Sequence, residues 1–160
     1  MSAGGVSVRQ KNIDDIKNKL NAFGAYECCT YSFINPNQFD KLCYPDDAPQ
    51  RNAIKLINPL SEEFSIMRTE LVGSMLNVIY TNRSRKNGDS RLYEIAKTYL
   101  PHSLPLTELP DEHDSLCIAY YGKDESFYTI KAAVVEIIGN YVSDFKLARS
   151  MKQYLHPGVS

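Results

Sequence analysis

Four basic side chains surround a single Asn-Gly turn near the middle of the chain: Arg83, Arg85, Lys86 and Arg91. Cations that converge on one tip can contact the phosphates of a nucleic acid. At a helix end, the same cations complement the negative end of the helix dipole instead. The net charge of the whole chain is −1, which gives no long-range attraction for nucleic acid. The cluster is therefore a candidate contact to nucleic-acid phosphates, and a solvated helix end is the alternative.

Catalytic chemistry finds little support in the residue spacing. Glu62 and Glu63 follow a Pro-Leu turn, where paired acids complement a helix N-terminus more often than they form an acid–base pair. Cys28 and Cys29 alternate across a predicted strand, and no histidine stands in a pattern that would activate either thiol. The glycines and histidines match neither a phosphate-binding loop nor a metal-ligand spacing. We therefore predict no catalytic, cofactor-binding or metal-binding residue in this chain.

Length and composition predict one folded domain. The chain has 160 residues, of which 43% are hydrophobic and 23% charged, which is ordinary globular usage. We expect residues 1–8 to be a disordered start and residues 9–160 to form a single module, truncated at its C-terminus after the turn at Pro157-Gly158. No apolar stretch approaches the roughly 20 residues of a membrane span, and no signal peptide is present. We expect a cytoplasmic protein with reduced cysteines and no membrane contact.

The first predicted helix, over residues 9–23, has an apolar stripe and ends at Gly24. The members of the stripe, at helical spacing, are Ile13, Ile16, Leu20 and Phe23. Such a stripe must be buried, either on the chain's own sheet or on a partner. Both alternatives stay open at this point.

The remaining pattern predicts a mixed α+β order without repeats. The further expected elements are a strand over 26–33, a short helix ending at 42, a strand over 53–57, a helix over 69–84, a strand over 91–100, a surface connection over 101–114, a strand over 116–121, a helix over 127–142 and a short strand over 145–148. We expect an antiparallel sheet flanked by helices. A parallel doubly wound sheet is the alternative, but no glycine-rich crossover turn supports it.

Three segments carry a resemblance to a known family. They are GAYECCTYSF at 24–33, NPLSEEFSIMRTEL at 58–71 and RLYEIAKTYL at 91–100. The first and third resemble motif 1 and the opening strand of motif 2 of class II aminoacyl-tRNA synthetases. The second is similar to a signature of the phenylalanyl-tRNA synthetase beta subunit. The resemblance implies a class II synthetase or biotin-ligase-like fold, in the catalytic-like module of that subunit.

Departures from the motifs imply that this module has lost catalysis. Tyr31 stands where motif 1 has a proline. Tyr99 is followed by Leu100 and Pro101, where motif 2 of an active synthetase has an arginine that binds the ATP α-phosphate. Leucine offers neither the donors nor the charge of a guanidinium. Motif 3, with a second ATP-binding arginine, would lie beyond Ser160.

The resemblance also implies partners. Two alpha and two beta subunits of this family form a phenylalanine-tRNA ligase, which charges tRNA-Phe. ATP, magnesium and phenylalanine are handled by the alpha subunit, so no cofactor is expected in this chain. The motif 1 helices of alpha and beta pack together, which would place the stripe Ile13, Ile16, Leu20 and Phe23 at the subunit interface.

Arg68 is expected to be structural, because its guanidinium has five donors and lies among many hydrogen-bonding side chains. Its expected partners are backbone carbonyls or a carboxylate such as Glu94. Two other functions stay open. A stand-alone synthetase-like or biotin-ligase-like enzyme predicts ATP binding by this chain alone. An RNA-binding module that uses the tip from Arg83 to Arg91 predicts steep salt dependence.

Overall fold

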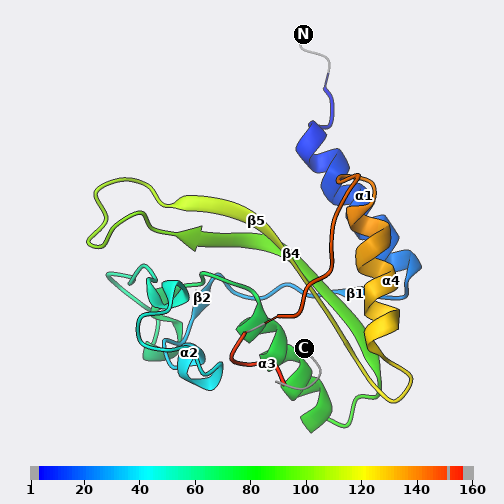
Figure 1. The fold of residues 1–160 in the computed structure, drawn as a ribbon. Helices are drawn as coiled ribbons and strands as arrows, with labels where there is room; N and C mark the ends of the chain where they lie inside the picture. The colour runs from blue at the N-terminus through cyan, green and yellow to red at the C-terminus, as the bar shows by residue number, and fades with distance from the viewer. Residues whose placement is uncertain (1–3, 151, 157–160) are drawn as a thin grey trace.

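The computed structural model describes residues 4–150 and 152–156, and it has an α+β order (Figure 1). Residues 1–3 of the expected disordered start and 157–160 at the expected truncation lie outside the described part. The helices are α1 (Val8–Ala22), α2 (Gln38–Lys41), α3 (Val72–Ser84) and α4 (Phe127–Ile138), with short 3-10 turns η1 (Pro49–Arg51) and η2 (Glu62–Phe64). The strands are β1 (Tyr26–Glu27), β2 (Phe33–Ile34), β3 (Ile66–Met67), β4 (Ser90–Leu100) and β5 (Asp111–Tyr121).

A three-stranded sheet in the order β1–β4–β5 runs through the molecule. β4 and β5 are antiparallel from end to end, with Leu100 opposite Asp111. β1 is parallel to β4, with Tyr26 opposite Leu92. The predicted antiparallel arrangement is therefore confirmed for β4 and β5 and wrong for β1. After the turn at Gly24, the chain runs in the same direction as β4. The pairing of β1 with β4 joins segments that lie far apart in the sequence, so local patterns do not reveal it.

Gly24 ends α1 as predicted. Its φ of +75° lies in the left-handed region, which a residue without Cβ adopts without strain. The next N–H, of Ala25, donates to the carbonyl of Leu20 at 3.0 Å, and the N–H of Gly24 donates to Asn21 at 2.9 Å. These two bonds form a Schellman turn, which satisfies the last carbonyls of the helix.

The predicted strand over 26–33 is instead two short strands in different sheets. β2 pairs antiparallel with β3, with Phe33 opposite Met67. Between β1 and β2, the backbone N–H and the hydroxyl of Thr30 donate to the carboxylate of Glu94, at 3.0 and 2.9 Å. Because these groups bind a side chain and not a neighbouring strand, the ladder is interrupted there.

Helix α3 begins at Val72, later than the predicted start at Thr69. The hydroxyl of Thr69 donates to the carbonyl of Gln50 at 2.7 Å, and the carboxylate of Glu70 accepts from the hydroxyl of Tyr44 at 2.8 Å. These long-range bonds hold residues 69 and 70 outside the helix. Helix α4 begins at Phe127 as predicted, where Ser126 forms a capping box with the side chain three residues later.

Three other predicted elements differ from the structure. β5 begins at Asp111, inside the predicted surface connection, because β4 supplies pairing partners out to its last residue and Lys97 Nζ lies 3.2 Å from Glu112 Oε2. The predicted strand over 53–57 contributes one isolated bridge, between Lys55 and Ile66. Residues 145–148 have no regular secondary structure.

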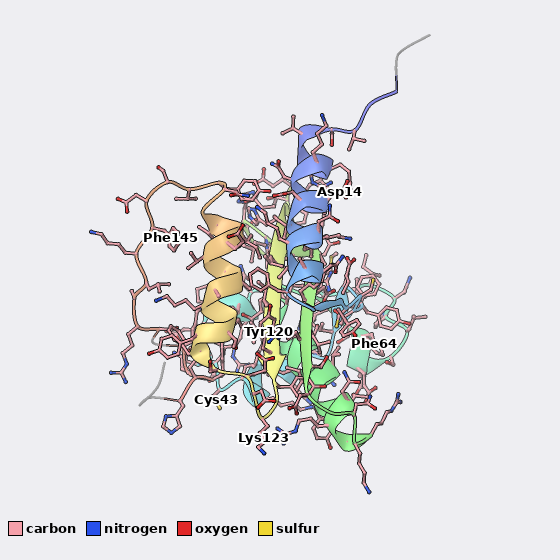
Figure 2. The ribbon with its side chains drawn as sticks, turned by 90° about the vertical axis from the view of Figure 1, so that its right-hand side faces the viewer. Asp14, Cys43, Phe64, Tyr120, Lys123 and Phe145 are labelled. Carbon is pink, nitrogen blue, oxygen red and sulfur yellow. The ribbon has the colours of Figure 1, made fainter. Side chains whose placement is uncertain are left out.

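Two apolar clusters hold these elements together. Helices α1 and α4 lie side by side over one of them (Figures 1 and 2), whose buried members are Leu20, Ala25, Tyr93 and Ile137. The other cluster joins β2, β3 and α2, and its members are Ile34, Phe39, Leu42, Tyr44, Ala48, Ala53 and Ile66. Across residues 4–150 and 152–156, no helix has the length and apolarity needed to cross a membrane.

Candidate functional site

A buried ion pair joins three segments at the centre of the molecule. Arg68, directly after β3, is 2% exposed, and Glu94 on β4 is 1% exposed. Arg68 Nη1 lies 3.1 Å from Glu94 Oε1, and Arg68 Nε donates to the carbonyl of Lys97 at 2.8 Å. The same carboxylate accepts from Thr30 between β1 and β2. The expected contact between Arg68 and Glu94 is therefore present.

The backbone of Arg68 reinforces this connection. Its N–H donates to the carbonyl of Ser32 at 2.9 Å, and its carbonyl accepts from the N–H of Tyr99 at 3.0 Å. Taking two charges out of water costs several kcal/mol per ion, which only good geometry and further hydrogen bonds offset. The guanidinium Nε and Nη1 both donate to acceptors within the protein, so this side chain connects β3 to β4 in the interior.

The basic tip is made by three of the four predicted cations. Arg83, Arg85 and Lys86 are exposed at the C-terminal end of α3. Beside them lies a shallow cavity of about 330 Å³, whose lining includes Arg83, Asp89 and Lys123. Lys123, on the turn that follows β5, adds a cation that the sequence analysis did not associate with the tip.

Arg91 is half-buried and paired within the chain, unlike the three exposed cations of the tip. Its Nε lies 2.6 Å from Glu125 Oε1, and its Nη1 donates to the carbonyl of Phe23 at 2.7 Å. The guanidinium also stacks 5.2 Å from the ring centre of Tyr120. The hydrogen bond to Glu125 raises the pKa of Arg91 and lowers the pKa of that carboxyl. The Nε and Nη1 donors of Arg91 therefore hold β4 to the segments beside α4 and α1, and its role as a phosphate contact stays a prediction.

The apolar stripe of α1 is mostly used within the chain. Leu20 is fully buried in the cluster below α1 and α4, and Ile16 packs against that cluster. Ile13 and Phe23 are half-buried. Leu20 is therefore wrong as a contact to another subunit, because α4 and the sheet already cover it. Of the stripe, only the half-buried residues keep surface that a partner could reach.

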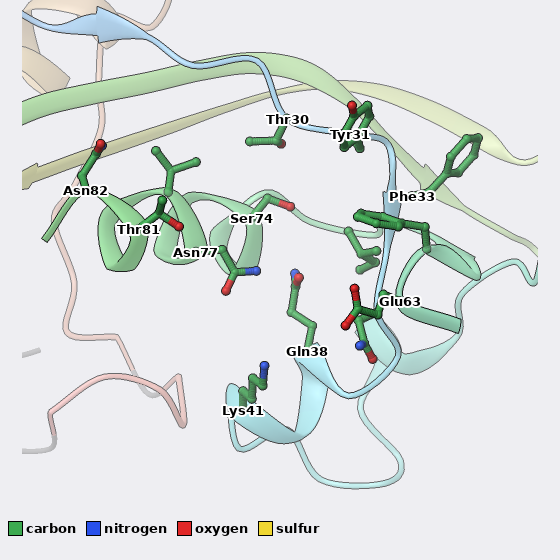
Figure 3. A pocket seen from close by; sticks show the side chains of 14 residues that line it. Thr30, Tyr31, Phe33, Gln38, Lys41, Glu63, Ser74, Asn77, Thr81 and Asn82 are labelled. Atoms are coloured by element: carbon green, nitrogen blue, oxygen red, sulfur yellow. The ribbon is translucent and has the colours of Figure 1, made fainter. Parts of the chain in front are cut away.

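A cavity lies between α2, α3 and β2 (Figure 3). It has a volume of about 450 Å³. One side is polar, with Gln38 and Lys41 from α2 facing Ser74 and Asn77 from α3, and another side carries the exposed ring of Tyr31. Chemically, the cavity offers hydrogen-bond donors, one cation and an aromatic wall.

Gly73 sets the distance between α2 and α3 at this cavity. A Cβ added to Gly73 would lie only 2.0 Å from Gln38 Nε2. The amide of Gln38 therefore packs directly on the backbone of α3, and the side chain is 6% exposed. The sequence analysis missed these residues. A glycine inside a helix pattern, which costs about 1 kcal/mol relative to alanine, was the signal of a close approach.

A second acid, Glu70, is half-buried beside the C-terminal segment. Glu70 Oε2 accepts from the hydroxyl of Tyr44 at 2.8 Å, and the ring of Tyr154 packs on Tyr44 at 5.9 Å between ring centres. Burial raises the pKa of the Glu70 carboxyl, against a smaller lowering by the Tyr44 hydrogen bond. Burial and the same carboxylate raise the pKa of Tyr44. Tyr44 is a buried member of the second apolar cluster, and Tyr154 packs against it.

All four cysteines are free, and burial raises the pKa of Cys117 to about 11, so its thiol stays protonated at neutral pH. Within residues 4–150 and 152–156, no three His, Cys, Asp or Glu side chains are grouped to hold a metal ion.

Comparison with known families decides what kind of protein this is. The whole chain, residues 1–160, matches the family model described as Phenylalanyl tRNA synthetase beta chain CLM domain. The chain belongs to this family. The predicted resemblance to the beta subunit is thereby confirmed.

Individual relatives agree with the family match. The chain is 37% identical over 158 residues to a phenylalanine-tRNA ligase beta subunit from Clostridium acetobutylicum, covering 96% of this chain and 19% of the relative. It is 34% identical over 146 residues to the corresponding subunit from Clostridium tetani, covering 91% of this chain and 18% of the relative. The chain thus spans about a fifth of the length of the relatives it matches.

The fold is similar to that of a solved synthetase structure. A pyrrolysyl-tRNA synthetase from Desulfitobacterium hafniense, PylSc, superposes with a TM-score of 0.62 at 14% sequence identity, covering 82% of this chain and 46% of that chain. This likeness supports the class II synthetase part of the predicted fold class, with a mixed sheet in place of the antiparallel one.

Proposed function

We propose that the chain is the noncatalytic core module of the beta subunit of a phenylalanine-tRNA ligase. The complete ligase would charge tRNA-Phe with phenylalanine at the expense of ATP, in the cytoplasm where tRNA is used. The observation that carries the proposal is the family match over the whole chain. The names of the relatives, which are beta subunits of that ligase, support the same reaction.

The end of β4 supports a noncatalytic role. An adenylating site needs a fixed positive charge on the phosphates, and leucine at position 100 supplies none. The nearest buried guanidinium, Arg68, has its Nε and Nη1 donors bound to Lys97 and to Glu94. ATP, magnesium and the adenylate would therefore be bound by the alpha subunit. We also propose that the fold is related to that of biotin ligases.

Assembly with the alpha subunit is the proposed task of the module, in a complex of two alpha and two beta subunits. Helix α1 supplies a surface for it: Ile13 and Phe23 are half-buried, and Val8 is 74% exposed. Leu20 and Ile16 already pack in the apolar cluster of this chain. The partner would therefore cover Ile13 and Phe23, at the edges of the stripe, and the polar outer face of α1. The packed inner face keeps the helix in place for that contact.

Co-purification of full-length subunits tests this role. The beta subunit carrying Ile13→Asp and Phe23→Asp should no longer co-purify with the alpha subunit. Both changes would place a charge in an apolar interface, where it would be buried without a partner. A matched change of two exposed apolar residues, Leu104→Asp and Leu109→Asp, should leave the complex intact, because the loop between β4 and β5 lies on the opposite side of the molecule from α1 (Figure 1). Retention of alpha by the first variant, with a native circular dichroism spectrum, would contradict the proposed interface.

The exposed tip supports a second function, which is binding to tRNA. Arg83, Arg85, Lys86 and Lys123 bring four cations together on one end of the molecule. Such a tip is suited to phosphate contacts with tRNA in the complex. The contact would add affinity without sequence specificity, because phosphates are the same in every tRNA.

A further inference from the structure

An exposed aromatic residue, Tyr80, lies beside the basic tip. Its side chain is 73% exposed on the outer face of α3, and Leu76, one turn earlier, is 46% exposed. Arg83 follows Tyr80 by three residues, so the two side chains are neighbours on one face of the helix, with about 5–6 Å between their Cβ atoms. The ring of Tyr80 contributes little to the core of this chain and is available to a ligand.

Two cations from separate segments face one hollow next to Tyr80. The cavity of about 330 Å³ at the tip is lined by Arg83 of α3 and by Lys123 of the turn after β5. Figure 2 shows Lys123 at the end of the molecule where α3 also ends. A guanidinium and an ammonium group that reach the same space can bind one phosphate together.

The acids near the tip leave it positively charged. Asp89 Oδ2 already accepts from the backbone N–H of Lys123 at 2.8 Å, and Glu125 is paired with Arg91. The four cations of the tip stand against Asp89 and Asp124, which leaves a net charge of +2. An apolar protein surface would bury this charge without a partner, at a cost of several kcal/mol per ion. The charge therefore favours a polyanion as the ligand.

The exposed ring distinguishes between two forms of nucleic acid. In a duplex, each base is stacked between its neighbours, so a protein ring finds no free base to contact. An unpaired base has a free face and stacks on aromatic side chains without regard to its sequence. A ring one helical turn away from a phosphate-binding cation therefore suits a single-stranded segment.

We propose that Tyr80 stacks on an unpaired base of tRNA while Arg83 and Lys123 bind the phosphate of the same or the next nucleotide. This inference rests on the tRNA contact proposed for the tip and specifies its ligand as an unpaired nucleotide. The stacking adds affinity that depends on strandedness, whereas the cations alone would bind any phosphate.

Affinities of the full ligase complex for a tRNA-Phe transcript test the stacking. Tyr80→Leu removes the ring and should raise the Kd about fivefold or more, with an unchanged salt slope because no phosphate contact is lost. Tyr80→Phe keeps the ring and should bind like the wild type. Tyr31→Leu, near the opposite end of α3 from Asn82 (Figure 3), is the matched control and should also bind like the wild type. An unchanged Kd for Tyr80→Leu, or an equal loss for Tyr80→Phe, would overturn the proposal.

A photo-crosslinker identifies the nucleotide. The complex with benzoylphenylalanine in place of Tyr80 is irradiated with the same transcript, and the adduct is mapped by the stop of reverse transcription. We expect one adduct, at an unpaired nucleotide, and no such adduct when the crosslinker replaces Tyr31. Adducts confined to a base-paired stem, an adduct to protein, or no adduct to RNA would each overturn the proposal.

The cations provide the test that separates the two proposals. If glutamine at positions 83, 85 and 86 changes the salt slope while Tyr80→Leu binds like the wild type, the tip contact stands and the stacking is wrong. If neither variant changes the binding of tRNA, the tip contact is wrong as well, and the stacking is overturned with it.

Discussion

Arg68 and Glu94 form an ion pair with 3.1 Å between Nη1 and Oε1, and both side chains are almost completely removed from water. The pair links the end of β3 to β4, and through Thr30 to the segment between β1 and β2. Both residues lie within the segments that resemble the synthetase motifs. In this chain, the pair holds three parts of the fold together. The Nε and Nη1 donors of Arg68 are bound within the protein.

Arg68→Ala should lower the free energy of unfolding by about 3–5 kcal/mol, because it leaves the Glu94 carboxylate buried without its charge partner. Chemical denaturation of the chain measures this change. Arg85→Ala, at an exposed position, is the control and should change stability by less than about 0.5 kcal/mol. An unchanged midpoint for Arg68→Ala would show that the pair does not support the fold.

Gly73→Ala should destabilise the chain by about 1–3 kcal/mol, because the new Cβ overlaps the amide of Gln38. Shortening the partner in Gln38→Ala removes the overlap. The double variant should therefore be more stable than the sum of the two single changes predicts, which a double-mutant cycle measures. Simple additivity would mean that the two side chains do not touch in solution.

Stability should depend on pH through Glu70. Its folded-state pKa is raised by burial, so the folded chain binds a proton that the unfolded chain releases. The cost of the buried charge is absent below the unfolded pKa and grows as pH rises through the folded pKa. Glu70→Gln should thus be more stable than the wild type at neutral pH, with the advantage vanishing in acid.

Unfolding midpoints measured from pH 4 to pH 8 check this dependence. Glu62→Gln, which changes an exposed acid, is the matched control and should not reproduce the effect. A Glu70→Gln variant that loses stability at neutral pH would show that the charged carboxylate is favourable where it stands.

Substituting glutamine for Arg83, Arg85 and Lys86 together should weaken tRNA binding by the complex. The slope of log K against log salt should become less negative by about 0.7–0.9 for each lost phosphate contact. Lys146→Gln, at an exposed position away from the tip, should leave the slope unchanged. An identical slope for the triple variant would assign these cations to solvent and to the end of α3.

Local patterns in the sequence predicted the parts of the fold that local physics determines. The stripe and Gly24 predicted α1, and the pattern from residue 127 predicted the start of α4, because spacing acts within a few residues. The parallel pairing of β1 was missed, since Tyr26 and Leu92 meet only in the folded chain. The interruption of the predicted strand at Thr30 was missed for the same reason, because Thr30 and Glu94 meet only in the folded chain.

The site residues divide in the same way. The contact of Arg68 with Glu94 was among the expected ones, because the five donors of a guanidinium need acceptors, which backbone carbonyls or a carboxylate supply. The ion pair of Arg91 was not foreseen, because its partner Glu125 lies beyond β5 and neither residue alone indicates the other. The cavity was missed entirely, since its walls come from three separate segments whose polar residues look like ordinary surface.

The central claim is that this module takes part in the ligase without binding ATP itself. Calorimetric titration of the chain with ATP and magnesium tests it most directly. The account predicts no saturable heat up to millimolar ATP, because position 100 supplies no cation and the Nε and Nη1 donors of Arg68 are bound to protein acceptors. A saturable signal in the micromolar range would contradict the account and identify the chain as a nucleotide-binding module in its own right.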